Sequence, residues 1–426
     1  MSSIKEEAER CLKCKRPKCS QACPVSTPVP QVMELFLDGR LPEAGALLFE
    51  NNPLSAICSV VCPHEKNCYG HCVLGKKGQP VQFYRVEEYT SQFYLETYAP
   101  EPAEKNGKKV AVVGAGPAGI TASITLAARG YGITLFDDMD SIGGAVRYGI
   151  PEFRLHSGKL DDYRRILDAF GVKFRPNRRI GPYITGADLF NDGYDAVFVA
   201  TGAVRPHRLG LLGETLGHVA FAVDYLMSPD SYRLGRKVVV VGAGNVAVDA
   251  ARTALRKGSS DVTLLNFMGP EEVSAYQDEV ELALIDGVRF RHYSQAIRIT
   301  DTSVQWVQVN KIIGDDGAVS FEDDVEVSGE EEADAVIIAI GQGPGAFLPA
   351  SGLEVTPAGL VAVDESGTTS KPRVFAAGDI VSGPRTVVEA VAHAKVAAQA
   401  LDEHCRPEQA QAVDPQSAPG DSGRTA

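Results

Sequence analysis

Residues 108–138 read KKVAVVGAGPAGITASITLAARGYGITLFDD, the pattern of a buried strand, a glycine turn, a helix and a second strand. This order is typical of a βαβ unit that binds a dinucleotide. Gly114 permits the tight turn, Gly116 lets the backbone approach a pyrophosphate, and Gly119 lets the helix pack on the strand. Asp137 ends the second strand, where a carboxylate can bind the ribose hydroxyls of an adenosine. The helix N-terminus then faces the phosphate charge.

A second copy of this unit follows at residues 236–268, which read RKVVVVGAGNVAVDAARTALRKGSSDVTLLNFM. Its turn is a GxGxxA variant formed by Gly242, Gly244 and Ala247, with Asn245 at the start of the helix. The alanine still allows close packing of the helix. By register with the first copy, Asn266 stands where Asp137 stands. The repeat therefore predicts a second dinucleotide site.

A late segment, KPRVFAAGDI at residues 371–380, reads as a strand that ends in Gly378 and Asp379. Taken alone, Asp379 could be a helix cap; next to the helix start in GPRTVVEAV, it can bind a ribityl chain while that helix faces the pyrimidine end of a flavin. These segments resemble the flavoproteins with two dinucleotide-binding domains. In that family the first glycine motif and the late strand form one FAD domain, interrupted by the nicotinamide domain. The resemblance adds four candidate FAD contacts: Gly144, Thr201, Thr386 and Val387.

Eight of the nine cysteines lie before residue 73, in CLKCKRPKCSQACP (11–24) and CSVVCPHEKNCYGHC (58–72). In a reducing compartment this density favours metal over disulfides. The spacings x2, x4, x3 and x3, x5, x3 favour two [4Fe-4S] clusters, with zinc or packing cysteines as alternatives. Counting alone makes all eight cysteines ligands and leaves Cys405 as a spare thiol. Four cations would offset the cluster charge or serve only solubility: Lys13, Lys15, Arg16 and Lys18.

Composition narrows the possible classes of protein and of binding partner. The 426 residues are 44% hydrophobic and 23% charged, as expected for about three globular domains. The net charge of −13 argues against a nucleic-acid partner. Without an apolar leader or a run of roughly 18 apolar residues, we expect a cytoplasmic chain that does not insert into a membrane. Residues 405–426 are rich in Pro, Ser, Gln and Gly, and we expect a disordered tail.

The order of the motifs is more specific than any one of them. The eight-cysteine region, VGAGPAG, GGAVRYGIPEFRL (143–155), VGAGNVAVDAARTAL and VFAAGDIVSGPRTVVEAV are together similar to the small subunit of NADPH-dependent glutamate synthase. They also resemble the N-terminal part of dihydropyrimidine dehydrogenase and the large subunit of bifurcating transhydrogenases. The resemblance implies one cluster held by Cys11, Cys14, Cys19 and Cys72, and another held by Cys23, Cys62, Cys68 and Glu87. Cys58 is then left over as a packing residue.

The resemblance also implies an α/β architecture of two Rossmann-like domains, one inserted in the other, behind an α-helical iron–sulfur domain. The expected boundaries are 1–100 for the cluster domain, 101–205 with 345–404 for the FAD domain, and 206–344 for the inserted NAD(P) domain. One feature departs from the family, because NADPH-using relatives carry arginines where this chain has Phe267, Met268 and Pro270. Asn266 can hydrogen-bond a ribose but cannot pair with a phosphate. The sequence therefore favours NAD(H) over NADP(H), with a lost nucleotide site as an alternative.

These cofactors predict a function. A hydride carries two electrons and a cluster takes one, so FAD between a nicotinamide site and two clusters would convert one into the other, without catalytic side chains. The motifs of this sequence indicate no substrate domain, so we expect a partner redox subunit or an electron-acceptor protein. The main hypothesis is an NAD(P)H:acceptor oxidoreductase subunit. The alternative is an electron-relay or structural subunit of a larger complex with a degenerate nucleotide site.

Overall fold

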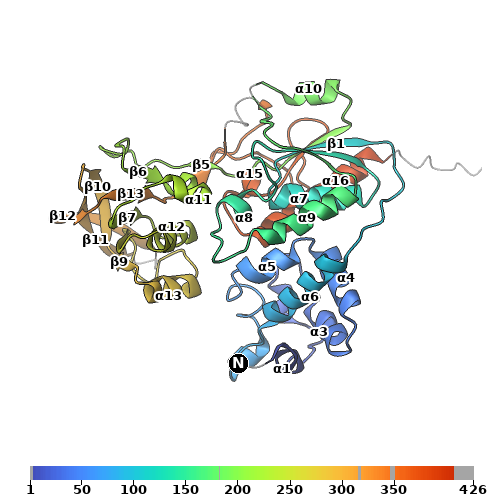
Figure 1. The fold of residues 1–426 in the computed structure, drawn as a ribbon, viewed down its shortest axis with the longest axis horizontal. Helices are drawn as coiled ribbons and strands as arrows, with labels where there is room; N and C mark the ends of the chain where they lie inside the picture. Colours follow the sequence, from blue (N-terminus) through green and yellow to red (C-terminus); the bar gives the residue numbers. More distant parts are fainter. Residues whose placement is uncertain (1–2, 182, 315–317, 346–350, 407–426) are drawn as a thin grey trace, which may run out of the picture.

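The structure is a computed structural model that describes residues 3–181, 183–314, 318–345 and 351–406. It has three parts: a helical N-terminal part drawn in blue, a first α/β part above it, and a second α/β part to the left (Figure 1). Nearly all of the predicted disordered tail lies outside the described residues, although α16 ends only at Cys405. None of the described helices is long and apolar enough to cross a membrane.

The N-terminal part consists of short helices whose ends the sequence specifies. Ser3 and Glu6 form a capping box at the start of the first helix, and prolines occupy the first turn of two others, where a missing N–H costs nothing. The elements are α1 (Ile4–Glu9), α2 (Lys18–Gln21), α3 (Val29–Leu37), α4 (Leu41–Asn51), α5 (Ser55–Val61), the 3-10 turn η1 (Val73–Lys76) and α6 (Phe83–Thr97).

Helix α6 carries a buried face on which Phe83, Val86, Glu87, Thr90 and Leu95 recur at helical spacing. A carboxylate therefore points inward among apolar neighbours. This face packs on the core of the N-terminal part, which also contacts four of the cysteines: Cys11, Cys19, Cys68 and Cys72. The fold thus places Glu87 on the cysteine side of the helix.

The first α/β part is built on a parallel five-stranded sheet with the order β15-β4-β1-β2-β3. Its strands are β1 (Lys109–Val113), β2 (Gly132–Phe136), β3 (Lys173–Arg175), β4 (Ala196–Val199) and β15 (Val374–Ala376). The apolar run in β1 is buried on both faces, as expected of a central parallel strand. Its helices are α7 (Pro117–Ala127), α8 (Ala145–Tyr148), α9 (Gly158–Ala169), α10 (Gly186–Asn191), α15 (Asp379–Ser382) and α16 (Val387–Cys405).

The second α/β part repeats this plan within residues that separate β4 from β15. Its parallel sheet has the order β6-β13-β7-β8-β9, and a three-stranded antiparallel sheet packs beside it. The strands are β6 (Val219–Phe221), β7 (Lys237–Val241), β8 (Asp261–Leu265), β9 (Arg289–Arg291), β10 (Ser294–Ile299), β11 (Ser303–Ile313), β12 (Val319–Glu332) and β13 (Ala335–Ile338). The helices are α11 (Ala222–Met227), η2 (Pro229–Ser231), α12 (Asn245–Arg256) and α13 (Gln277–Asp286).

The chain enters and leaves the second part through two adjacent segments. β5 (Arg205–Pro206) pairs antiparallel with β14 (Gln342–Gly343), so the two crossings form one short ribbon. The chain therefore passes between the host and the inserted domain at this ribbon, in the order of an insertion that the motifs predicted. The host and the N-terminal part instead share one hydrophobic core, in which Ile57 and Leu95 pack with residues of α7 and α16.

Candidate flavin, nucleotide and iron–sulfur sites

The first glycine turn has the geometry of a phosphate cradle. Gly114 has a φ of +105°, and a Cβ there would overlap the Ala200 carbonyl oxygen. A Cβ at Gly119 would overlap the Gly114 carbonyl oxygen. At Gly116 a Cβ would meet only the Cα of Gly144, 3.8 Å away. Contacts within the chain therefore require glycine at positions 114 and 119. They do not require it at Gly116, where the absence of a side chain leaves open space in front of the N-terminus of α7.

Asp137 is fixed beside this turn by the backbone. Its Oδ2 accepts a hydrogen bond from the Ala115 N–H at 2.5 Å, and its Oδ1 accepts one from the Met139 N–H at 2.8 Å. Burial raises the pKa of Asp137, although these two hydrogen bonds act in the opposite direction. The carboxylate is thus held at the end of β2, and each oxygen still has a lone pair for a ribose hydroxyl.

The tertiary fold brings Gly378 and Asp379 next to the first glycine turn. Gly378, with a φ of +79°, precedes α15, and a Cβ there would lie 2.9 Å from the Cβ of Ala118 in the first turn of α7. Asp379 accepts a hydrogen bond from the Arg385 N–H at 3.3 Å, and burial raises its pKa to about 6. Thr386 caps α16 directly before Val387, in a capping box.

One buried hydroxyl at this site lacks a partner. Thr201 follows the strand β4, and its Oγ1 is buried without a hydrogen-bond partner among the described residues. A buried hydroxyl left unpaired is costly, and this one lies beside the glycine turn, because Gly114 contacts the Thr201 backbone. The open cradle at Gly116 and the unpaired hydroxyl both fit a bound dinucleotide.

The second glycine turn repeats the cradle. Gly242 has a φ of +140° and abuts the Ala339 carbonyl, whereas a Cβ at Gly244 would meet only Ser274 Oγ, at 3.5 Å. Ala247 is fully buried under the turn, which is the close packing expected of the GxGxxA variant. Asn245 accepts a hydrogen bond from the Tyr276 N–H at 2.9 Å, so its side chain anchors the loop after β8.

Asn266 lies at the end of β8, as its register predicted, and it is only 4% exposed. Its Nδ2 lies 3.5 Å from His292 Nδ1, and its Oδ1 has no partner among the described residues. Phe267 packs edge-on against Phe321. An amide with an unpaired oxygen at this position can accept a hydrogen bond from a ribose hydroxyl.

Two arginines of α12 and the lysine that follows this helix are each paired with an acid. Arg252 binds Glu279 at 2.7 Å and Asp286 at 2.8 Å. Arg256 shares Asp286, at 2.7 Å. Lys257 binds Asp230 at 2.5 Å. Each of these cations is therefore already neutralised by an acid of this chain.

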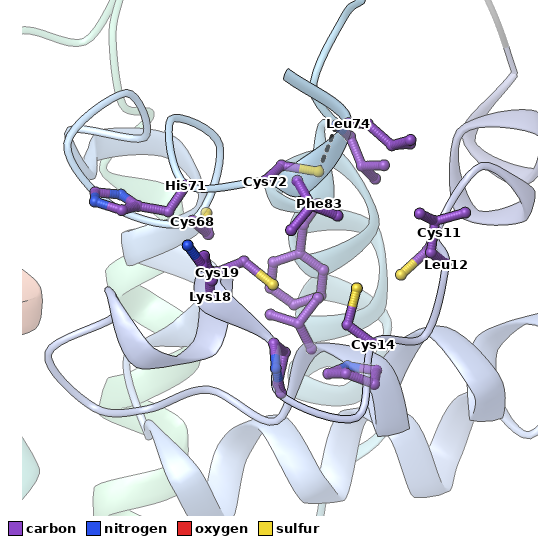
Figure 2. A pocket seen from close by; sticks show the side chains of 15 residues that line it. Cys11, Leu12, Cys14, Lys18, Cys19, Cys68, His71, Cys72, Leu74 and Phe83 are labelled. Carbon is purple, nitrogen blue, oxygen red and sulfur yellow. Dashed lines mark hydrogen bonds between the residues drawn. The ribbon is translucent and has the colours of Figure 1, made fainter. Parts of the chain in front are cut away.

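Residues of the first cysteine run and the end of the second surround an outer hollow (Figure 2). The sulfurs of Cys11, Cys14, Cys19 and Cys72 face it, and Cys68 and Phe83 complete its inner wall. Burial raises the pKa of Cys11 and Cys19, and the Val81 N–H donates to Cys72 Sγ at 3.4 Å. The fold thus brings together the four cysteines of the first expected ligand set.

A second hollow, called the inner hollow here because Cys58 and Glu87 in its lining are buried, shares Cys68 and Phe83 with the outer one. Its lining includes Cys23, Cys62, Cys68 and Glu87, and also Cys58. Glu87 is 7% exposed, and burial raises its pKa to about 8. A hydrogen bond with Cys58, together with burial, raises the pKa of Cys62. Both Cys58 and Glu87 therefore border this hollow, and its geometry alone does not separate the two expected ligand sets.

None of the nine cysteines is in a disulfide. In the described parts of the chain, no three His, Cys, Asp or Glu side chains converge closely enough for a single metal ion. Four sulfurs around a shared hollow are the donor set of a polynuclear iron–sulfur cluster, whose irons and sulfides would fill the space between them. Binding would require the thiols to lose their protons, which a metal cluster promotes.

Sequence reasoning missed one residue at the junction of the two α/β parts. Arg154, in the GIPEFRL segment, is 11% exposed and binds Asp249 at 2.6 Å and Glu279 at 2.9 Å. The neighbouring Phe153 ring lies under the guanidinium of Arg256, 4.0 Å away. Host and inserted domain are thus joined by a buried ion-pair network. The only sequence signal is the pair of charged residues, Glu152 and Arg154, in this short motif.

Comparison with known proteins agrees with this geometry. Residues 108–394 match the family described as pyridine nucleotide-disulphide oxidoreductase, and residues 1–98 match dihydropyrimidine dehydrogenase domain II with its 4Fe-4S cluster. The chain is 32% identical to the glutamate synthase [NADPH] small chain of Escherichia coli, over 93% of this chain and 90% of that one. The chain belongs to the glutamate synthase small-chain family. It is an oxidoreductase with FAD- and NAD(P)-binding domains and a 4Fe-4S domain.

Other members of the glutamate synthase small-chain family carry different names. The NAD-dependent dihydropyrimidine dehydrogenase subunit PreT of E. coli is 33% identical, over 93% of each chain. The solved structure of Mycobacterium tuberculosis FprA in complex with NADPH superposes with a TM-score of 0.61 at 19% identity, covering 70% of this chain and 84% of that one. The prediction of two Rossmann-like domains behind a helical iron–sulfur domain is confirmed.

Proposed function

We propose that this chain is the NAD(H)-dependent subunit of a redox complex, which exchanges hydride at its nucleotide site and single electrons with a partner subunit through two [4Fe-4S] clusters. When bound, FAD exchanges two electrons with a nicotinamide and one at a time with a cluster. The overall balance is NADH giving NAD⁺, one proton and two electrons. The names of the relatives, as small chain and subunit, support a partner.

The observation that carries this proposal is the serial arrangement of the sites. Cys68 and Phe83 line both cysteine hollows, so the two hollows are adjacent. Val388, in the first turn of α16, lines the inner hollow. Thr386 and Val387 begin the same helix at the proposed flavin site. The chain therefore spaces the flavin site, the inner hollow and the outer hollow along one path.

Within this arrangement the residues have distinct tasks. Gly116 and the N-terminus of α7 receive the FAD pyrophosphate, Asp137 binds the adenosine ribose, and Asp379 binds the ribityl chain. The outer cluster is held by Cys11, Cys14, Cys19 and Cys72, and the inner one by Cys23, Cys62, Cys68 and Glu87. The proposed domains are 1–100, 101–205 with 345–404, and 206–344.

The chain should prefer NADH to NADPH, by roughly tenfold or more if the difference is one charge-assisted hydrogen bond of about 1.5–3 kcal/mol. Asn266 offers a neutral amide to a ribose hydroxyl, whereas the cations of α12 and its C-terminal end are paired with Glu279, Asp286 and Asp230. A 2′-phosphate that binds here would give up its water shell, and no cation would replace the interactions lost. The measurement is anaerobic flavin reduction with each nucleotide at equal, sub-saturating concentration.

Faster reduction by NADPH would contradict this preference. Absence of reduction by either nucleotide would favour the second candidate function, an electron-relay or structural subunit with a degenerate nucleotide site. The observation that favours the NAD(H)-dependent function over this second candidate is the open space at Gly244. No contact within the chain requires a glycine there.

Arg154→Ala is expected to destabilise the junction between the FAD and nucleotide domains by about 3–5 kcal/mol, the usual cost of removing one partner of a buried ion pair. It leaves Asp249, which is 3% exposed, without its closest cation. We expect a lower melting temperature and slower flavin reduction by NADH at an unchanged FAD content. Arg233→Ala, at an exposed position, is the matched control.

The pH dependence of this variant follows from Asp249. Burial raises its pKa to about 6 even though Arg154 lowers it. Without Arg154 the folded-state pKa rises further above the unfolded value, so the folded variant takes up a proton there as the pH falls. The loss of melting temperature should therefore be smaller at about pH 5 than at about pH 8. An equal loss at both values would show that Asp249 does not carry the effect.

A further inference from the structure

His292 lies against Asn266 at the end of β8, although the two residues are 26 positions apart in the chain. The backbone on both sides of the histidine fixes this contact. The Asn266 N–H donates to the Arg291 carbonyl oxygen at 3.0 Å, and the Ser294 N–H donates to the Asn266 carbonyl oxygen at 2.9 Å. The ring of His292 also stacks on Phe290, with 17° between the two planes. The short segment between β9 and β10 therefore presents an imidazole to the end of β8.

This segment is held in a strained conformation. Tyr293 has a φ of +51°, in the left-handed region that a residue other than glycine rarely adopts. Its N–H donates to the Met268 carbonyl oxygen at 3.2 Å, and its carbonyl oxygen accepts from the Val309 N–H at 2.8 Å. Strain of this kind persists where the surrounding contacts determine it, and it is common at functional sites. Packing on Phe290 explains the ring of His292, but it does not explain a ring nitrogen directed at a buried amide.

The contact with His292 orients the side-chain amide of Asn266. In a neutral imidazole one ring nitrogen donates a hydrogen bond and the other accepts one. Asn266 presents its Nδ2, a donor, to His292 Nδ1 at 3.5 Å, so Nδ1 is the acceptor. The amide oxygen is thereby turned away from the ring, and in the described part of the chain it is buried without a partner. Neutral His292 thus leaves an acceptor free for a ribose hydroxyl.

Protonation of His292 would reverse this orientation. A protonated imidazole donates through both nitrogens, so its Nδ1–H would face the Nδ2 donor of Asn266. The amide would then rotate, so that its oxygen accepts from His292 and its Nδ2 becomes free. A free donor beside a positive charge suits a phosphate, whose charged oxygens accept hydrogen bonds. A ribose hydroxyl both donates and accepts, so it pairs with the amide in either orientation.

The segments packed around His292 carry both acids and bases. They include Glu272 of the loop after β8, Arg291 of β9, Tyr293, Lys311 of β11 and Glu331 of β12. Glu272 forms an ion pair with Lys311, and Arg291 binds Glu331 at 3.1 Å. These charges therefore largely neutralise one another.

The proton affinity of His292 reflects these surroundings. Burial lowers its pKa, whereas a hydrogen bond to the Met268 backbone and the charge of Glu272 act in the opposite direction. The imidazole is therefore neutral near pH 7, and it takes up a proton as the pH falls below about 6.5.

We propose that His292 sets which nucleotide the second cradle accepts: neutral, it turns Asn266 Oδ1 toward a ribose hydroxyl, and protonated, it turns Asn266 Nδ2 and its own charge toward a 2′-phosphate. His292 is a positioning residue, because it acts through Asn266. The inference rests on the proposed function and adds a pH dependence to its nucleotide site. The chain should be selective for NAD(H) near neutral pH and lose much of this selectivity in acid.

The test measures binding rather than turnover, on the oxidised full chain loaded with its cofactors. NAD⁺ and NADP⁺ are titrated separately by calorimetry at about pH 7.5 and at about pH 5.5, on either side of the ordinary histidine pKa. We expect the dissociation constant of NADP⁺, divided by that of NAD⁺, to fall by about tenfold at the lower pH, as for one added charge-assisted hydrogen bond. The dissociation constant of NAD⁺ should change by less than about threefold.

Two variants isolate the imidazole. His292→Phe keeps an aromatic ring on Phe290 and removes both nitrogens. His292→Gln still accepts from Asn266 Nδ2 but never gains a charge, so it should keep the selectivity of neutral pH in acid as well. The 2′-phosphate itself titrates near about pH 6, but its contribution is common to all the proteins compared. In both variants the ratio should therefore change by less than about threefold between the two pH values.

The matched control is His404→Phe, at an exposed position near the end of α16, where the ring meets Phe375 edge-on. It should keep the tenfold change. Melting temperature and FAD content show that each variant is folded. Equal pH dependence in the unmodified chain and in both His292 variants would overturn the inference. A ratio that does not change with pH in the unmodified chain, or that ceases to change in His404→Phe as well, would also overturn it.

The proposed function is tested separately, by reduction of the flavin with NADH. Selectivity for NAD⁺ at about pH 7.5, without the change in acid, would leave the proposed function standing and overturn the role of His292. A change that depends on His292, without reduction by NADH, would support its role and contradict the proposed function. Absence of binding by either nucleotide at both pH values would contradict both.

Discussion

Gly116→Val is expected to give a folded chain without flavin. The backbone at Gly116 has a φ of −77°, which any residue adopts, and a Cβ there meets only Gly144 Cα at 3.8 Å. The variant should therefore fold, because the new side chain occupies the open cradle rather than the core. Its methyl groups would stand where the pyrophosphate must approach the N-terminus of α7. Flavin released per chain, together with the melting temperature, measures both effects.

Two matched variants make this result specific. Gly217→Val adds the same side chain at an exposed glycine where a Cβ meets nothing within 4 Å, and it should retain FAD. Gly244→Val fills the second cradle and should retain FAD but lose reduction by NADH. Stoichiometric FAD in Gly116→Val would show that the flavin has been assigned to the wrong repeat.

The second large effect concerns the clusters. The chain purified without oxygen should contain about eight iron and eight acid-labile sulfides, and Cys14→Ala should lose about half of each. Cys14 lines only the outer hollow, so the inner cluster should survive. Cys405→Ala, at the end of α16, is the control and should keep the full content. One or two zinc ions without labile sulfide in the unmodified chain would contradict the cluster assignment.

The same assay separates Cys58 from Glu87 at the inner hollow. Glu87→Ala should lose the inner cluster or convert it to a form with less iron, because it removes a ligand. Cys58→Ala should keep about eight iron, because it removes only a buried packing residue. The reverse pattern would assign Cys58 as the fourth ligand. A change in the spectrum of the inner cluster, with the outer one unaltered, provides a second readout.

The glycine turns could be predicted from the sequence because their requirements are local. Gly114 and Gly242 both need a positive φ where the backbone turns beneath a neighbouring carbonyl, and this need is visible as a glycine after a buried strand. The acid or amide at the end of the second strand follows from the regular length of a βαβ unit. Asp137 and Asn266 accordingly lie where the sequence placed them.

Which cysteines share a cluster depends on contacts between residues that are far apart in the chain. Spacing alone made all eight cysteines equivalent, and only the family resemblance implied that Cys72 joins the first run while Cys23 joins the second. The structure brings these partners to shared hollows because α6 and the loops before it fold the two runs against each other. It also places both Cys58 and Glu87 at the inner hollow, so the choice between them that the sequence left open stays open.

The sequence by itself determined the two βαβ units, their order around the insertion and the cysteine-rich helical part, because glycine turns, apolar strands and helix caps depend on residues near one another in the chain. Only the tertiary structure decided how charged side chains are used. The packing of α12 against α13 commits Arg252 and Arg256 to Asp286, which no local pattern in the sequence indicates. Arg154 joins two domains through acids that lie 95 or more positions away. Ion pairs of this kind depend on which surfaces meet, and that is fixed by the packing of the whole chain.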